Sequence, residues 1–371
     1  MSLDFLYLNE PDMIRAGVLD MDRCLASMDE LFRLMGKGDY LMGGPYENSH
    51  GLMLWFPLEK RTGNTPVAGP DRRFMAMPAY VGGRFHVCGQ KWYGSNRENT
   101  KKGLPRSILT VMLNDVDTGA PLSLMSANLL SSMRTGAVPG VATKYLQSSD
   151  ASVIGVVGAG VISRSCLLAI AKTIRNGKEV RVYDIVPSQS ERFCAEMQSQ
   201  ISIPLRSVSA MQDAVVDCDI VSIAASGASP VVIEDQWIKE GAVIEISGSA
   251  DFSESCYLNN RIVMDNWLMH KEWLDELRDE PDRLTNINAG HPSAKLLQLV
   301  ASGKKNISDI VSLSDLIEKP ALGRINDKEK IIFFTGGMAT EDVAWGFDVY
   351  QEALRLGIGQ KLNLWDQPHW A

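Results

Sequence analysis

The sequence predicts an α/β protein in which a doubly wound parallel sheet is inserted into an α+β domain built from both ends of the chain. Two observations lead to this interpretation. From about residue 152, almost uninterrupted apolar runs alternate with helical segments, which is typical of a parallel sheet covered on both faces. The preceding segment instead carries strand-like runs separated by turn residues, an antiparallel pattern. We therefore expect one domain over residues 1–134 and 318–371, and the inserted domain over residues 135–317.

The first part of the chain is predicted to begin with a helix and to continue as antiparallel strands. Residues 12–35 have apolar residues at helical spacing, which predicts an amphipathic helix. Residues 43–70 are rich in Gly, Pro and Asn and indicate a loop, interrupted by one apolar run, GLMLWF. Three strand-like runs follow, RFMAMPAY, RFHVCGQKWY and SILTVMLND.

The second part predicts a parallel sheet and then a return to the first domain. Its strands are SVIGVV, EVRVYD, DIVSIAA, AVIEIS and RIVMDN, all strongly apolar. The pattern changes near Gly323, where we expect a strand at KIIFFTG and a final helix from about Glu341 to Leu356.

The composition is that of a globular protein with room for two domains. The 371 residues are 45% hydrophobic and 22% charged, and the formal net charge is −8. A negative chain argues against nucleic-acid binding, because neutralising phosphates requires a basic surface. The start MSLDFLYLNE lacks the features of a signal peptide, and no apolar stretch reaches 18 residues. The six cysteines include no C-x-x-C pair, so we expect reduced cysteines in a cytoplasmic protein that holds no metal.

The stretch VIGVVGAGVISRSC has the character of a dinucleotide-binding turn of the Rossmann type. Gly158 and Gly160 allow a tight turn between a buried strand and a helix, whose free N–H groups suit a pyrophosphate. Ser163 stands in place of the third glycine, where it needs slightly more room for packing of the helix against the strand. The alternative is a flavodoxin-like turn that binds no dinucleotide.

The residue at the end of the next strand bears on the choice of cofactor. Asp184 lies where an acid can accept a hydrogen bond from the ribose 2′-OH. No arginine follows it directly, which favours NAD as the cofactor. Arg192, further along the chain, leaves NADP as an alternative.

Three polar residues are candidates for binding or catalysis. Arg134, just before a helical stretch, could hold a substrate carboxylate with two hydrogen bonds, or it could pair with a surface acid. Lys91, at the end of a strand, could bind a carboxylate or take a proton from an amine, or it could lie on the surface. Asp251 follows the strand AVIEIS, at the edge where doubly wound sheets bind ligands, or it could cap a following turn. The five histidines show no metal-ligand spacing.

Taken together, these segments resemble the ornithine cyclodeaminase and mu-crystallin family over roughly residues 70–350. The most specific stretches are GQKWYGSN with Lys91, MRTGAVPGVATKYL with Arg134, and LGRINDKEKIIFFTGGMATEDVA. The resemblance implies a Rossmann domain that binds NAD(P). It also implies a substrate and dimerisation domain whose sheet pairs with that of its dimer mate to close a β-barrel. Enzymes of the family oxidise an amino acid to its imine or reduce an imine.

The resemblance also implies roles for individual residues. Lys91 and Arg134 would hold the substrate carboxylate, and Lys91 and Asp251 would take part in catalysis. Where the cyclodeaminases have G-x-D-x-P-G-K-x-E-L, this chain has GSADFSESCYL. Asp251 therefore falls one residue late. This departure is evidence against the cyclising reaction more than against the oxidation or reduction step. The residues expected to contact the cofactor are Thr135, Gly158, Ala159, Gly160, Val161, Ile162, Asp184 and Ser226.

A histidine replaces an arginine of the substrate-binding region. The family often places a carboxylate-binding arginine on the strand before M-P, and this chain has His50 directly before GLMLWF. We expect His50 to contact the substrate, while the arginine could be replaced by Arg61, Arg72 or Arg73.

The resulting hypothesis is an NAD-dependent oxidoreductase that interconverts a small amino acid and its imine and works as a homodimer. Fixing the substrate carboxylate would orient Cα–H toward the nicotinamide ring, and such positioning is a large part of the rate. One alternative is an ornithine cyclodeaminase proper, an ammonia lyase that forms proline. Others are a non-enzymatic protein that binds NAD(P)H or another ligand, and an accessory subunit of an amine oxidase.

Overall fold

The computed structural model describes residues 2–226, 229–277 and 292–370, and the chain divides into two compact units. Unit 1 comprises residues 1–20, 38–134 and 338–371, and unit 2 comprises residues 21–37 and 135–337. The predicted fold class is confirmed, since a parallel sheet of the Rossmann type occupies a segment inserted into an α+β unit. None of the described helices is long and apolar enough to cross a membrane.

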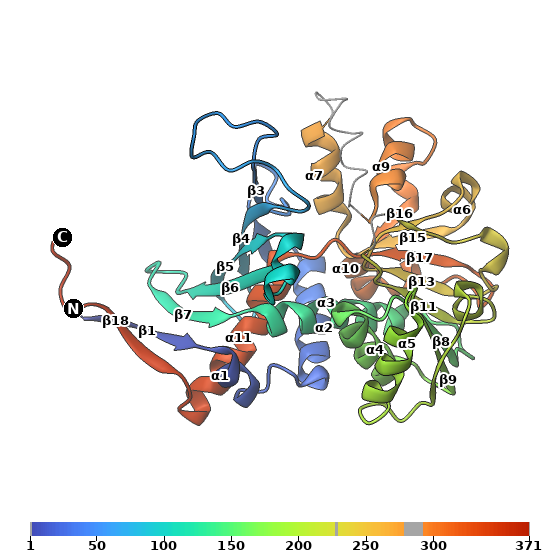
Figure 1. Cartoon of the computed structure of the whole chain (residues 1–371), viewed down its shortest axis with the longest axis horizontal. Coiled ribbons are helices and arrows are strands. Elements are labelled where there is room, and N and C mark those ends of the chain that lie inside the picture. Colours follow the sequence, from blue (N-terminus) through green and yellow to red (C-terminus); the bar gives the residue numbers. More distant parts are fainter. Residues whose placement is uncertain (1, 227–228, 278–291, 371) are drawn as a thin grey trace. The chain divides into compact units, whose positions relative to one another are not determined.

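Unit 1 is built on an eight-stranded sheet in the order β18-β1-β7-β6-β5-β4-β2, with β3 also paired to β4 (Figure 1). Strand β1 runs parallel to β7, and the other pairs are antiparallel. The strands are β1 (Leu3–Leu8), β2 (Tyr40–Met42), β3 (Leu52–Trp55), β4 (Arg73–Val81), β5 (Val87–Ser95), β6 (Ser107–Asn114), β7 (Pro121–Ser126) and β18 (Gln360–Trp365). The helical segments are α1 (Glu10–Arg15), η1 (Arg97–Lys102), the start of α3 (Asn128–Leu146) and α11 (Ala339–Leu356).

The central strands of this sheet have one buried and one exposed face. Because side chains alternate along a strand, every second residue of β4, β5 and β6 points toward helix α11, which packs on that face. The other face carries the exposed apolar side chains Phe74, Trp92 and Ile108. The rings of Phe74 and Trp92 stack with their centroids 5.7 Å apart. This outer face is an apolar surface that a single copy of unit 1 leaves open to solvent.

Unit 2 is built on an eight-stranded sheet in the order β10-β9-β8-β11-β13-β17-β15-β16, in which all pairs are parallel. The inner strands are buried along their whole length, as their apolar runs require. The strands are β8 (Val153–Val157), β9 (Glu179–Tyr183), β10 (Leu205–Ser207), β11 (Ile220–Ile223), β13 (Val243–Ile246), β15 (Arg261–Met264), β16 (Ile310–Ser312) and β17 (Ile331–Phe334), with β12 (Val231–Val232) and β14 (Ala250–Asp251) forming a separate pair. The helices are α2 (Met21–Gly36), the remainder of α3, α4 (Val161–Thr173), α5 (Pro187–Met197), α6 (Glu254–Asn259), α7 (Trp267–Leu277), α9 (Ala294–Ala301) and α10 (Leu313–Glu318), with short 3-10 turns η2 (Met211–Ala214), η3 (Asp235–Trp237), η4 (Ile307–Asp309) and η5 (Pro320–Leu322).

One buried carboxyl group marks the face of the parallel sheet that α3 covers. Glu245 lies in the middle of β13, is fully buried, and accepts a 2.7 Å hydrogen bond from the Thr143 hydroxyl of α3. Burial raises the pKa of Glu245 well above its ordinary value, which favours the neutral form of the side chain. The opposite face is apolar and packs against residues of α6 and α9.

Helices α3 and α4 approach each other closely at two glycines. A Cβ on Gly136 would lie 2.2 Å from the backbone carbon of Ser165, and one on Gly140 would lie 2.6 Å from the Cβ of Ala169. The glycines of GAVPG therefore provide close helix packing in this unit, and Ser163 of α4 is buried.

The helix expected over residues 12–35 is two helices, α1 and α2. Gly17 has a φ of 83°, which a helix interior does not allow, and the chain turns between Arg15 and Met21. Helix α2 groups with unit 2, where it packs against α4 and α10.

The return to the first domain also differs from the expected position at residue 318. The strand KIIFFTG is β17, which pairs in parallel with β13 and β15 inside the sheet of unit 2. Its fully apolar sequence suits a strand covered on both faces, so we propose that the domain boundary follows Gly337.

Candidate functional site

Two basic and two acidic side chains are buried together in unit 1. Lys91 Nζ donates to Asp342 Oδ2 over 2.7 Å, and Arg134 Nε donates to Asp342 Oδ1 over 3.0 Å. Arg134 Nη1 also donates to Glu341 Oε2 over 2.5 Å, and its Nη2 donates to the Ser131 hydroxyl over 3.2 Å. Lys91 and Arg134 are 3% and 4% exposed, and both acids are fully buried.

The elements of unit 1 explain how these groups meet. Lys91 lies on the inner face of β5, between Met77 of β4 and Val111 of β6, and points toward α11. Glu341 and Asp342 are in the first turn of α11. Both acids therefore lie at the positive end of the helix, where carboxylates are stabilised.

The charges of this cluster shift one another's ionisation. Burial, together with the neighbouring charge of Arg134, lowers the pKa of Lys91 from 10.5 to about 8. Burial alone would raise the pKa of Asp342, but the charges of Arg134 and Lys91 hold it below its ordinary value. Lys91 can therefore exchange a proton at a pH near neutrality, whereas Asp342 stays ionised.

The cluster leaves hydrogen-bonding capacity on Arg134. Its three donors to Asp342, Glu341 and Ser131 use three of the five N–H groups of a guanidinium. Among the described residues one N–H on Nη1 and one on Nη2 make no hydrogen bond, and each can donate to a bound anion.

The structure places Lys91 and Arg134 differently from the sequence expectation. Lys91 is in the middle of β5, not at a strand end, and Arg134 is inside α3, not before it. Neither is a surface residue. Sequence reasoning did not predict that Glu341 and Asp342 pair with Lys91 and Arg134. The available signal was two adjacent acids in the segment ATEDVAW, which is otherwise mostly apolar and begins α11.

The residues considered as further substrate contacts do not all join this cluster. His50 lies two residues before β3 and is partly exposed. Arg73 forms an ion pair with Asp71 and lies over the Trp55 ring at 5.2 Å. Arg72 lies 4.9 Å from the Phe56 ring centroid, and Arg61 is exposed. Thr135, the next residue after Arg134 in α3, is partly exposed and groups with unit 2.

The predicted dinucleotide turn lies in unit 2 at the carboxyl end of β8. Gly158 has a φ of 95°, and a Cβ there would lie 3.0 Å from the Cα of Ala225, so only glycine fits. Gly160 begins α4 without a side-chain cap, and a Cβ there would meet nothing within 4 Å. The N–H groups of the first turn of α4 are therefore not covered by a capping side chain, and a phosphate fits such a site.

Asp184 holds this turn in place. Its Oδ2 accepts from the Ala159 N–H over 2.8 Å, and its Oδ1 accepts from the Val186 N–H over 2.9 Å. The carboxylate is partly exposed directly after β9. The other predicted cofactor contacts also reach the surface of unit 2, with Val161 and Ser226 exposed and Ile162 partly exposed.

Asp251 forms an ion pair that the sequence did not suggest. It ends β14, and its Oδ1 accepts from Lys295 Nζ over 2.8 Å and from the Phe252 N–H over 2.9 Å. The helix that follows is capped by Ser253, which accepts from the Cys256 N–H, so Asp251 is not the cap.

No group of three or more His, Cys, Asp or Glu in the described part of the chain could hold a metal ion. His291, one of the five histidines, lies outside the described residues.

Comparison with known proteins identifies the family. The model of the "Ornithine cyclodeaminase/mu-crystallin family" matches residues 18–356. The chain belongs to this family. The ornithine cyclodeaminase/mu-crystallin assignment thus rests on most of the chain and not on the glycine turn alone.

Individual members of the family resemble this chain over nearly its whole length. N-((2S)-2-amino-2-carboxyethyl)-L-glutamate dehydrogenase of Staphylococcus aureus is 26% identical, covering 98% of this chain and 100% of that protein. An archaeal alanine dehydrogenase dimer with bound NAD has a TM-score of 0.78 and 25% identity, over 98% of this chain and 100% of that one. The Thermococcus litoralis Delta(1)-pyrroline-2-carboxylate reductase in complex with NADH and L-proline has a TM-score of 0.77 and 26% identity. The match covers 96% of this chain and 99% of that one.

Asp342→Asn tests the cluster of buried charges. The change leaves the ammonium of Lys91 and the guanidinium of Arg134 buried with Glu341 as the remaining anion, and removing one partner of a buried ion pair is strongly destabilising. We expect the free energy of unfolding to fall by about 3 kcal/mol, measured by urea titration at pH 7. As a control on the same helix, Glu352→Gln should cost under about 1 kcal/mol, because its partner Arg355 is mostly exposed. Equal effects of the two changes would contradict the proposed importance of Asp342.

Lys91→Met tests the lowered pKa of the lysine. Between pH 8 and 10.5 the unfolded chain keeps the lysine proton that the folded chain has lost, so the stability that Lys91 contributes rises with pH. Below pH 8 the lysine is charged in both states and its burial cost is fully present. We expect the unfolding free energy of the wild type minus that of the variant to increase by on the order of 1–3 kcal/mol from pH 8 to 10.5. A difference that stays flat from pH 8 to 10.5 would show that the pKa of Lys91 is not lowered.

Proposed function

We propose that this chain is an NAD-dependent oxidoreductase that interconverts a small amino acid and its imine. The observation that carries the proposal is the buried cluster in which Asp342 holds Lys91 and Arg134 together. Two buried cations with spare N–H groups are suited to a small anion, and the substrates of this class carry a carboxylate beside the reacting carbon. The related alanine dehydrogenase and pyrroline-2-carboxylate reductase are named for such substrates.

Arg134 and Lys91 have separate tasks in this proposal. Arg134 binds the carboxylate through the remaining N–H groups of Nη1 and Nη2, and its fixed position in α3 orients the neighbouring Cα. Lys91 adds a hydrogen bond to the carboxylate, and with a pKa of about 8 it can accept a proton from the substrate amine. His50 is a further candidate contact to the substrate.

The turn of unit 2 is proposed to hold the dinucleotide. The uncapped start of α4 suits the pyrophosphate, and the Asp184 carboxylate suits the hydroxyls of a ribose better than a 2′-phosphate, which favours NAD over NADP. A bound NAD would supply the hydride acceptor for oxidation at Cα, and a bound NADH the hydride donor for reduction. The proposed protein contacts are Thr135, Gly158, Ala159, Gly160, Val161, Ile162, Asp184 and Ser226.

Asp251 is the second candidate for proton transfer. Its Oδ1 is committed to Lys295 and Phe252, while the side chain is 40% exposed. The run that replaces G-x-D-x-P-G-K-x-E-L therefore anchors Asp251 to a lysine of α9, which favours a redox enzyme over a cyclising lyase. We also propose that the protein acts in the cytoplasm, because its six free cysteines suit a reducing compartment.

The assembly is proposed to be a homodimer joined through the outer face of the unit 1 sheet. Phe74, Trp92 and Ile108 form an apolar patch there that water would otherwise cover, and burying such a patch drives association. The solved archaeal alanine dehydrogenase is a dimer.

The activity is tested with a panel of amino acids and imino acids, each with NAD or NADP, followed by absorbance at the NADH band and by ammonia and proline assays. We expect a net change in NADH with a small amino acid or imine. Ammonia and proline without net NADH would instead indicate a cyclodeaminase. Tight NAD binding with no turnover of any compound would contradict the enzymatic proposal.

Arg134→Lys should raise KM and lower kcat/KM at least about a hundredfold, because one ammonium cannot replace the two parallel hydrogen bonds of a guanidinium. NADH affinity, measured by fluorescence, should stay unchanged. Unchanged kinetics would remove Arg134 from the substrate site, and loss of NADH binding as well would indicate a general folding defect.

Trp92→Glu tests the dimer by placing a charge in the apolar patch of unit 1. We expect a wild-type dimer in sedimentation equilibrium and a variant that dissociates at least about a hundredfold more readily, because a charge cannot be buried there without a partner. The control is Leu268→Glu, at a half-exposed position of unit 2, which should leave the dimer intact. A monomeric wild type would contradict the proposal.

A further inference from the structure

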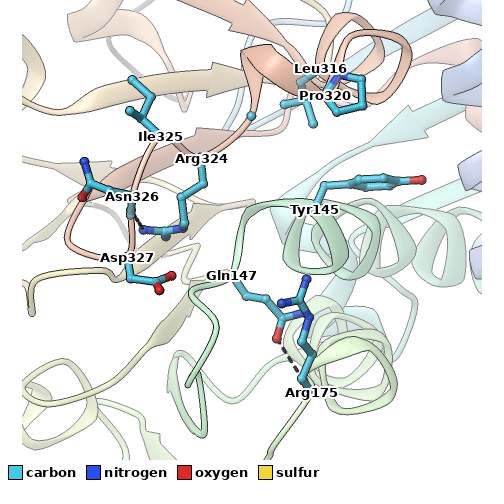
Figure 2. A pocket seen from close by; sticks show the side chains of 10 residues that line it. Tyr145, Gln147, Arg175, Leu316, Pro320, Arg324, Ile325, Asn326 and Asp327 are labelled. Carbon is cyan, nitrogen blue, oxygen red and sulfur yellow. Dashed lines mark hydrogen bonds between the residues drawn. The ribbon is translucent and has the colours of Figure 1, made fainter.

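Unit 2 has a pocket that is remote along its strands from the dinucleotide turn. The pocket measures about 410 Å³ and is lined by residues of the segments that lead into strands β8, β9 and β17, together with residues of α3 and α10 (Figure 2). All pairs of this sheet are parallel, so these positions lie at the amino-terminal edge, whereas Gly158 lies at the carboxyl end of β8. The lining residues are Tyr145, Gln147, Arg175, Leu316, Pro320, Gly323, Arg324, Ile325, Asn326 and Asp327.

The first cation of the pocket is held rigidly. The Arg324 guanidinium donates from Nε to the Leu146 carbonyl over 2.7 Å, from Nη2 to the Gly241 carbonyl over 2.8 Å, and from Nη1 to the carbonyls of Asn326 and Glu329. Carbonyl oxygens fix the orientation of the group but carry no negative charge. Among the described residues no carboxylate forms an ion pair with Arg324, although the charges of Glu329, Asp327 and Asp150 act on it from a greater distance.

The second cation reaches the same pocket from the end of α4. The backbone N–H of Arg175 donates to the Gln147 side chain over 2.9 Å, and Gln147 in turn donates to the Thr173 carbonyl, which fixes the start of the arginine (Figure 2). The side chain of Arg175 is exposed. Its charge acts on Asp327, the carboxylate of the same pocket.

One acid of the pocket limits its net charge. Both oxygens of Asp327 accept from Ser149, one from its N–H over 3.0 Å and the other from its hydroxyl over 2.7 Å. The hydrogen bonds to Ser149 hold the pKa of Asp327 below its ordinary value, so it stays ionised. Counted over the lining residues alone, two guanidinium groups and one carboxylate leave a net charge of about +1, which suits a monoanion better than a dianion.

The rest of the lining is apolar. It comprises the ring of Tyr145, whose hydroxyl is bonded outside the pocket to Asp29, with Leu316, Pro320 and Ile325. Ile325 is 71% exposed although it is aliphatic. A ligand that covers Ile325 would remove apolar area from water.

From these observations we propose that this pocket binds a small monocarboxylate with an apolar body, its carboxylate on Arg175 and Arg324 and its body on Tyr145 and Ile325. The site is separate from the candidate active site and does not depend on the proposed activity. A bound ligand would tie together the ends of α3 and α4 and the segment before β17, and would stabilise unit 2 against unfolding.

Benzoate is the probe, because it joins one carboxylate to a flat apolar ring. Titration calorimetry and melting temperature of the full chain should show that benzoate binds and stabilises the wild type. Acetate, which lacks the ring, and benzamide, which lacks the charge, should bind at least about tenfold more weakly. Absence of benzoate binding, or equal binding of benzamide, would overturn the proposal.

Arg175→Met assigns the binding to this pocket. The residue is exposed, so the variant should fold, and benzoate affinity should fall at least about tenfold while NADH affinity is unchanged. Ile325→Ser should weaken benzoate without weakening acetate. The matched control is Arg192→Met on α5, an exposed arginine bonded only to Gln189 among the described residues, which should leave benzoate affinity unchanged. Benzoate affinity that survives Arg175→Met would place the anion elsewhere, for example on Arg134, and would overturn this proposal without touching the proposed activity.

Discussion

The carboxylate of Asp342 is the interaction on which the candidate site depends. One side chain accepts from Lys91 of β5 and from Arg134 of α3, and it belongs to α11. Three elements of unit 1 therefore converge on two oxygen atoms. Burying two cations is unfavourable unless anions neutralise them, so Asp342 and Glu341 make it possible for Lys91 and Arg134 to stay inside the unit. The same arrangement keeps their positions fixed, which a substrate-binding cation pair requires.

Unit 2 is organised by a different constraint, the close approach of backbone to backbone. Gly136 and Gly140 allow α3 to pack against α4, and Gly158 allows the turn after β8 to pass close to Ala225. Asp184 then bonds the turn from the neighbouring strand. The glycines of α3 face Ser165 and Ala169 of α4, whereas Ser163, which replaces the third glycine of G-x-G-x-x-G, is itself buried.

Much of this could be predicted from sequence, and the limit has a physical cause. Apolar runs and glycine positions are local signals, so the parallel strands and the turn at Gly158 could be predicted from them. The pairing of buried charges is not local: Asp342 lies 251 residues from Lys91 and 208 from Arg134 along the chain. The ion pair of Asp251 with Lys295 is hidden for the same reason. Strand β17 shows a second limit of sequence-based prediction. A fully apolar run such as IIFF indicates a buried strand but does not indicate which of the two sheets the strand joins.

The two ends of the chain form one feature of the sheet in unit 1. The family match covers residues 18–356, yet β1 and β18, on either side of it, pair with each other, with Leu3 opposite Trp365 (Figure 1). Among the described strands β18 pairs only with β1, and β1 also pairs with β7. Strand β1 is therefore what joins β18 to the rest of the sheet, so a change that unfolds β1 would release β18 as well.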